Sequence, residues 1–125
     1  MKVIVIDDDP VTLEVTQAML ESLGHEVVTL KSPIGAAAVL LRERPDLALV
    51  DVEMPGLSGD DWLSLIREKK LLGEGLSVDF VLHSGLPAED LERLVERTGA
   101  LGAIRKEGHP ASFLAAFRRM TEPEA

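Results

Sequence analysis

The stretch KVIVIDDDP, residues 2–10, joins a short apolar run to three consecutive aspartates and a proline. The run has no alternation of polar and apolar residues, which is typical of a strand buried on both faces of a parallel sheet. Asp9 can cap a following helix, and Pro10 suits the first helical position. The stretch therefore predicts a strand followed by a helix, and it leaves Asp7 and Asp8 at the end of the strand to be explained.

The rest of the chain repeats this alternation of strand and helix. Further strands are predicted at EVVTL (26–30), DLALVD (46–51), VDFVLHS (78–84) and LGAIRK (101–106). Helices are predicted from Pro10 to Gly24, from Ser32 to Pro45, from about Asp60, from Pro87 to Gly99 and from Pro110 to Met120. Parallel neighbours need crossover connections, and these are right-handed. The pattern thus predicts an α/β domain with a doubly wound, five-stranded parallel sheet.

Helical periodicity also predicts which side chains of each helix face the core. The predicted core positions are Val11, Val15 and Met19 in the first helix, Ile34, Ala37, Ala38 and Leu41 in the second, Trp62, Leu63 and Ile66 in the third, and Phe113, Leu114 and Phe117 in the last. In the fourth strand, alternation points His83 away from the side of Ser84. Together with His25 and His109, we interpret it as structural.

Length and composition indicate one compact domain. The chain has 125 residues, of which 46% are hydrophobic, and we expect a single domain over residues 1–120 with a frayed tail at 121–125. A net charge of −9 argues against direct binding of nucleic acid. The sequence contains no cysteine, and no apolar run approaches the ~18 residues of a membrane span. We therefore expect a soluble cytoplasmic protein whose amino terminus belongs to the fold.

Polar side chains follow four of the predicted strands. Asp7 and Asp8 follow the first strand, Asp51 the third, Ser84 the fourth and Lys106 the fifth. In an open parallel sheet these carboxyl ends share one edge, where ligands bind. Carboxylates within ~4 Å repel by about 1 kcal/mol per pair in water and by about 4 at an effective dielectric of 20, so the cluster needs a counter-charge. Magnesium, which commonly takes one or two carboxylates plus a phosphate, is the natural candidate.

These residues resemble the receiver domain of two-component response regulators. The resemblance rests on the pair Asp7-Asp8, the run DVEMPGLSG from Asp51 to Gly59, Ser84 and Lys106, and it covers nearly the whole chain. It implies a flavodoxin-like (βα)5 topology and a phosphorylation-controlled signalling switch of the single-domain kind. Such a domain catalyses only its own phosphorylation and dephosphorylation, so the resemblance implies that the chain is not otherwise an enzyme.

The resemblance also implies a role for each site residue. Asp51 would accept the phosphoryl group from the phosphohistidine of a histidine kinase or phosphotransfer protein. Asp8, Asp51 and the backbone carbonyl of Glu53 would bind Mg²⁺ directly, and Asp7 would reach it through water. Lys106 would pair with the phosphoryl oxygens.

Ser84 would be the switch residue. Its hydroxyl would move onto the phosphoryl group and carry the loop from Gly85 to Pro87 with it. With no output domain in these 125 residues, the signal would leave through a protein target, or through a phosphorylation-dependent homodimer formed by the last two helices.

The sequence departs from the receiver pattern at two positions. Receivers commonly carry an aromatic residue three positions before the lysine, and this chain has Ala103 there. The proline that usually follows the lysine is replaced by Glu107. In the family, the residues two after the acceptor and two after the switch tune the lifetime of the phosphate, and here they are Glu53 and Leu86.

Two alternatives remain open at this point. A degenerate receiver that is never phosphorylated would act as a docking module. The segment DDDPV also fits the opening motif of haloacid dehalogenase-type phosphatases, with Asp7 as nucleophile. That family needs a further acidic metal-binding motif after the lysine, and no aspartate occurs after Asp90.

Overall fold

The computed structural model describes residues 1–54, 61, 78–106 and 109–122. The strands are β1 (Lys2–Ile6), β2 (Glu26–Leu30), β3 (Leu47–Asp51), β4 (Asp79–Ser84) and β5 (Gly102–Arg105), and the described helices are α1 (Pro10–Ser22), α2 (Ala36–Glu43), α4 (Ala88–Thr98) and α5 (Pro110–Thr121). Apart from Asp61, the helix predicted from about residue 60, with Trp62, lies outside the described residues, and so do residues 123–125 of the predicted tail.

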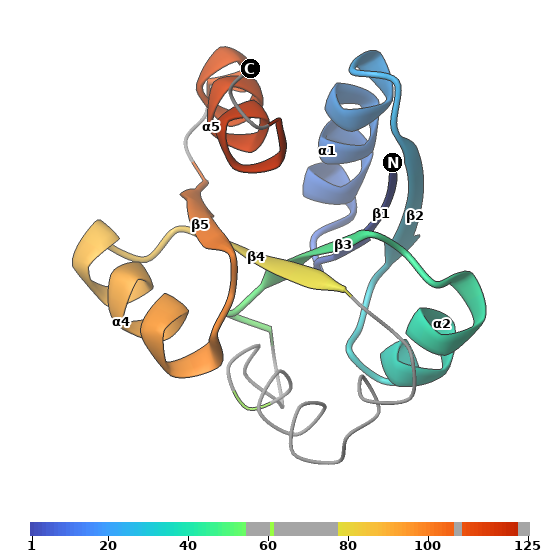
Figure 1. Cartoon of the computed structure of the whole chain (residues 1–125), viewed down its shortest axis with the longest axis horizontal. Helices are drawn as coiled ribbons and strands as arrows, with labels where there is room; N and C mark the ends of the chain where they lie inside the picture. Colours follow the sequence, from blue (N-terminus) through green and yellow to red (C-terminus); the bar gives the residue numbers. More distant parts are fainter. Residues whose placement is uncertain (55–60, 62–77, 107–108, 123–125) are drawn as a thin grey trace.

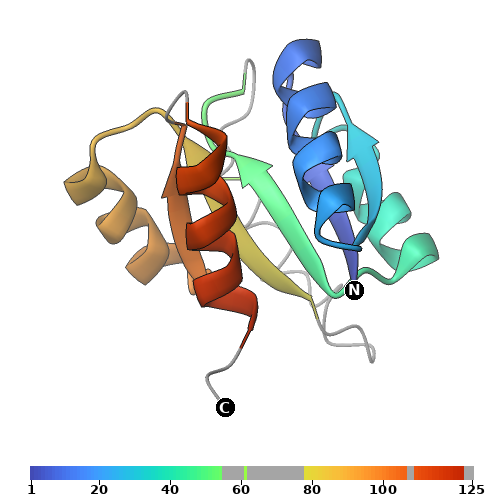
Figure 2. The same cartoon turned by 90° about the horizontal axis from the view of Figure 1, so that it is seen from above.

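The five strands form one parallel sheet in the order β2-β1-β3-β4-β5, which confirms the predicted doubly wound fold. Helices α1 and α5 cover one face of the sheet, and α2 and α4 cover the other (Figure 1). Figure 2, turned by 90°, shows α1 and α5 on the same side of the strands. The strand order reverses at β1, which pairs with both β2 and β3. In open α/β sheets, ligands bind beyond the strand ends at such a reversal.

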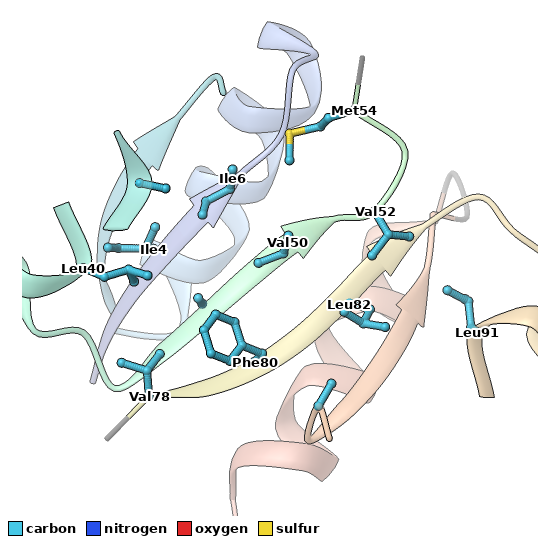
Figure 3. Packing of buried hydrophobic residues seen from close by; sticks show 13 residues of the cluster. Ile4, Ile6, Leu40, Val50, Val52, Met54, Val78, Phe80, Leu82 and Leu91 are labelled. Carbon is cyan, nitrogen blue, oxygen red and sulfur yellow. The ribbon is translucent and has the colours of Figure 1, made fainter. Parts of the chain in front are cut away.

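Each face of the sheet has its own hydrophobic cluster. Val3 and Val5 of β1 belong to the cluster beneath α1 and α5, together with Phe117. Ile4 and Ile6 alternate with them and join the opposite cluster, which also holds Phe80 (Figure 3). Because β1 is buried on both faces, its apolar run cannot alternate with polar residues.

The buried face of α1 differs from the predicted one. Val11 and Val15 are 65% and 47% exposed, whereas Leu13, Thr16 and Leu20 are buried. Met19, the third predicted position, is partly buried and packs against the cluster, so the buried face is rotated from the predicted one, and the contacts of α1 with β1, β2 and α5 set this rotation. Periodicity alone does not fix this rotation, because the predicted set and the buried set both have helical spacing.

The second helix begins later than predicted. Gly35 adopts the left-handed conformation (φ 78°) and precedes α2, so Ser32, Pro33 and Ile34 lie outside the helix. Ile34 is 89% exposed, and its N–H donates to the Ser32 hydroxyl in a local turn. Counted from the true start, the buried positions are Ala36 and Leu40. The predicted face from Ile34 to Leu41 is therefore wrong, because Ile34 belongs to the turn before the helix and does not share its periodicity.

The predicted ends of α1 are confirmed. The Asp9 side chain accepts a hydrogen bond from the N–H of Val11 at 3.1 Å, and Gly24 beyond the last turn has φ 90°. Only a residue without Cβ adopts this φ readily, so glycine ends the helix at low cost. Among the described residues, no helix combines the length and the apolar character required to cross a bilayer.

Candidate functional site

The predicted site residues meet at the carboxyl edge of the sheet. Asp7 and Asp8 follow β1, Asp51 ends β3, Ser84 ends β4, and Lys106 follows β5. One oxygen from each of Asp7, Asp8 and Asp51 lies within 4.8 Å of the other two. The sequence-based placement of these side chains on one edge is thus confirmed.

Backbone contacts hold the two buried carboxylates. Asp7 and Asp51 are 1% and 3% exposed, whereas Asp8 is exposed. The N–H of Asp9 donates to Asp7 Oδ1 at 3.0 Å, and the N–H of Glu53 donates to Asp51 Oδ1 at 2.9 Å. Each carboxylate therefore accepts from the amide two residues further on, so the turn after each strand orients it.

Packing positions the chain beyond Asp51. Val52 and Met54 are each 5% exposed and belong to the cluster on the α2 and α4 face (Figure 3). Glu53 lies between them and is exposed. The alternation of buried and exposed residues therefore continues past β3, and it leaves the Glu53 side chain outside the core.

Lys106 lies between the two buried carboxylates. Its Nζ is 2.8 Å from Asp7 Oδ2 and 3.2 Å from Asp51 Oδ2. Burial alone would lower the pKa of Lys106, but the hydrogen bond to Asp7 and the negative charges of Asp51 and Asp7 raise it above its ordinary value. Burial and the nearby Asp7 raise the pKa of Asp51 despite its bond to the Glu53 amide and the Lys106 charge. Lys106 therefore stays charged and offsets part of the repulsion.

The site fits a divalent cation. With all three aspartates ionised, the single charge of Lys106 leaves two negative charges uncompensated within this cluster. Asp7 Oδ2 is buried, and apart from the Lys106 ammonium it has no well-oriented hydrogen-bond donor within the described part of the chain. Hard oxygen donors few enough to leave room for water favour magnesium.

Ser84 has a resting partner that sequence reasoning missed. Its hydroxyl donates to Glu53 Oε1 at 2.5 Å and accepts from the N–H of Leu86 at 3.1 Å. The sequence predicts two roles for Glu53, a backbone carbonyl that binds Mg²⁺ and a residue that tunes the lifetime of the phosphate, but it does not predict this contact. The two residues are 31 positions apart, and no local spacing signals such a contact.

His83 is buried on the face of the sheet that α1 and α5 cover. It is 6% exposed, and its ring centroid lies 5.3 Å from that of Phe113 in α5. Burial, with a smaller contribution from the Lys106 charge, lowers the pKa of His83 to about 4. The structural interpretation of this histidine is confirmed, and its ring is neutral near pH 7.

Neutral His83 predicts a loss of stability in mild acid. Because its pKa is lower in the folded chain than the ordinary 6.5, folding favours the neutral form, and the stabilisation present above pH 6.5 is lost as pH falls towards 4. The shift corresponds to roughly 3 kcal/mol in the free energy of unfolding. Urea unfolding between pH 7 and pH 4 measures this loss. His83→Leu should flatten the curve, and a curve as steep as wild type would contradict the assignment.

Comparison with known proteins gives consistent matches. Residues 3–118 match the family described as the response regulator receiver domain. Protein PilH of Pseudomonas aeruginosa is 36% identical over 58 residues, which cover 46% of this chain and 48% of that protein. The sensory/regulatory protein RpfC of Xanthomonas campestris pv. campestris is 29% identical over 114 residues, 91% of this chain but only 16% of its own length. The chain thus spans less than half the length of these two relatives.

Solved structures show the same fold. The BeF3-activated N-terminal receiver domain of Klebsiella pneumoniae RstA superposes with a TM-score of 0.80 at 28% identity, covering 98% of this chain and all of that one. The response regulator TrrA of Thermotoga maritima, solved in complex with Mg²⁺-BeF, gives a TM-score of 0.76 at 22% identity over 95% of this chain and 97% of that one.

Proposed function

This chain belongs to the response regulator receiver domain family, and from that premise we propose that Asp51 is its phosphoryl acceptor. The family is one of signalling domains rather than of catalytic enzymes. Its homologues act in two-component systems, where receivers work as phosphorylation-controlled switches. We assign residues 1–120 to the receiver domain and 121–125 to a tail, whose first residue, Thr121, is also the last residue of α5.

The observation that carries the proposal is the position of Asp51, which forms an ion pair with Lys106 and lies beside the other two aspartates. Asp51 Oδ2 lies 3.2 Å from Lys106 Nζ, and the Asp51 carboxylate shares the cluster with Asp7 and Asp8. In the resting state, Lys106 neutralises Asp7. Once Asp51 has reacted, Lys106 pairs with a phosphoryl oxygen.

The transfer can be written from the residues present. An Asp51 carboxylate oxygen attacks the phosphorus of a phosphohistidine, the P–N bond breaks, and the imidazole nitrogen keeps the electron pair. Lys106 and the Ser84 hydroxyl stabilise the charge on the transferring oxygens. Asp7, Asp8, Asp51 and the backbone carbonyl of Glu53 would hold Mg²⁺. When bound, it supplies positive charge that screens the carboxylates and the phosphoryl group from each other.

The proposed partners follow from this chemistry. The donor is a histidine kinase or a phosphotransfer protein, and the signal passes to a protein target or to a second copy of the chain. The net charge of −9 supports protein rather than nucleic-acid partners, and we infer that the protein acts in the cytoplasm. The alternative of a haloacid dehalogenase-type phosphatase is wrong, because residues 3–118 match the receiver domain family.

Incubation with a small acyl phosphate and Mg²⁺ tests the proposal. The intact mass should rise by one phosphoryl group, and hydroxylamine should remove it, as expected for an acyl phosphate. If the mass does not change under conditions in which Mg²⁺ binds, the unphosphorylated docking module becomes the better hypothesis.

Ser84 should carry the response to phosphorylation. A ligand shifts a conformational equilibrium only through different contacts in the two states, and Ser84 can exchange Glu53 for a phosphoryl oxygen. With beryllofluoride as the phosphoryl mimic, backbone NMR shifts should be largest from Ser84 to Asp90. Ser84→Ala should abolish most of them. Large shifts over β5 and α5 that survive in Ser84→Ala would assign the switch to another residue.

A further inference from the structure

We propose that Arg105 is the second moving part of this switch and transmits the displacement of Ser84 to the surface between α4 and β5. The inference rests on the proposed function, because it concerns how the same site signals. It starts from a hydrogen bond at the other end of the switch loop: Arg105 Nε donates to the backbone carbonyl of Leu86 at 3.1 Å.

A chain of hydrogen bonds leads from the acceptor loop to this arginine. Glu53 accepts from the Ser84 hydroxyl at 2.5 Å, and the same hydroxyl accepts from the N–H of Leu86 at 3.1 Å. The carbonyl of Leu86 then accepts from Arg105. Leu86 is therefore held on its N–H by the switch residue and on its carbonyl by Arg105. A move of the Ser84 hydroxyl away from Glu53 disturbs both bonds.

The backbone beneath this chain is firmly held. Ser84 pairs in register with Arg105, and the N–H of Lys106 donates to the Ser84 carbonyl at 2.7 Å. The main chain at the ends of β4 and β5 is thus held by the sheet, while the Arg105 side chain reaches two residues beyond its strand partner. The loop from Gly85 to Pro87 can move relative to β5. Such a movement changes the hydrogen bond between the Arg105 side chain and the Leu86 carbonyl.

The surroundings of Arg105 allow its side chain to change position. Arg105 is exposed and lines a groove between α4 and β5, which is also lined by Ala103, Glu92 and Glu96. Ala103 carries only a methyl group, so at this position of β5 no large side chain fills the groove beside Arg105. Once released from Leu86, the guanidinium meets the two glutamates of α4, which attract a cation. Phosphorylation then changes both the shape and the charge of the α4 and β5 surface.

NMR of the arginine side chains tests the inference directly. In the full chain, the Arg105 Nε–H resonance is assigned by its absence in Arg105→Lys. Beryllofluoride with Mg²⁺ should shift this resonance and speed its hydrogen exchange by roughly threefold to tenfold, as expected for the loss of one hydrogen bond. The Arg118 resonance is an internal control, because Arg118 of α5 pairs with Glu122, the residue that follows the helix. It should not change.

The variants separate this inference from the proposed function. In Ser84→Ala, the Arg105 resonance should no longer respond. In Arg105→Ala, the shifts from Ser84 to Leu86 should persist, those at Leu91 and Val95 of α4 should fall, and phosphorylation by the small acyl phosphate should be unchanged. An Arg105 resonance that stays fixed while Gly85 and Leu86 shift, or one that responds in Ser84→Ala, overturns the inference and leaves the function standing. No response at any of these positions, together with no phosphorylation, overturns the function itself.

Discussion

Asp51→Asn should abolish the gain of a phosphoryl group from a small acyl phosphate with Mg²⁺, where wild type gains one. An amide is a far weaker nucleophile than a carboxylate, and the substitution also removes the charge that faces Lys106 at 3.2 Å. Asparagine has nearly the shape of aspartate, and its side-chain oxygen can still accept from the Glu53 N–H. The variant should therefore fold, so intact mass measures the chemistry alone.

A matched control is Asp79→Asn, which removes an exposed aspartate at the start of β4. Its distance from the carboxyl edge of the sheet predicts full phosphorylation. Retention of the added mass by Asp51→Asn would show that another residue accepts the group. Hydroxylamine distinguishes the two kinds of product, since it cleaves an acyl phosphate but leaves a serine phosphate intact.

Asp8→Ala should weaken the binding of Mg²⁺ by more than tenfold. Asp8 supplies one of the three clustered carboxylates, and the interaction of one unit charge with a close cation is worth several kcal/mol at an effective dielectric near 20. Because Asp8 is exposed, its loss leaves the core and the buried pair of Asp7 and Asp51 in place. A titration followed by backbone NMR or calorimetry measures the affinity, which should be weak in wild type because water completes the coordination.

Asp9→Ala provides the control for this measurement. Asp9 is the next residue, and its side chain caps α1 through the N–H of Val11 and the hydroxyl of Thr12. Its loss should lower the stability of the chain, as is typical for an N-cap, while the affinity for Mg²⁺ stays close to wild type. Equal affinities in wild type and Asp8→Ala would contradict the metal site.

The predicted strands and the convergence of the site are confirmed because both depend on local pattern and on one general rule of topology. A continuous apolar run such as Val3–Ile6 specifies a buried strand without reference to any partner. Once the strands are parallel, Asp7, Asp51 and Lys106 must meet at one edge. The same argument does not fix helix rotation. Val11 and Ile34 have the correct spacing but face solvent, since contacts with the sheet and α5 set the rotation of α1, and α2 begins only after Gly35.

The sequence by itself thus determined the strand-helix order, the parallel sheet and the set of residues at its carboxyl edge. Only the tertiary structure decided how those residues are paired. Lys106 lies between Asp7 and Asp51, Ser84 donates to Glu53, and Arg105 donates to Leu86. The last two contacts join residues 31 and 19 positions apart. Side chains that far apart along the chain have no periodicity in common, and their meeting depends on strand register, loop path and rotamer, which are set when the domain packs.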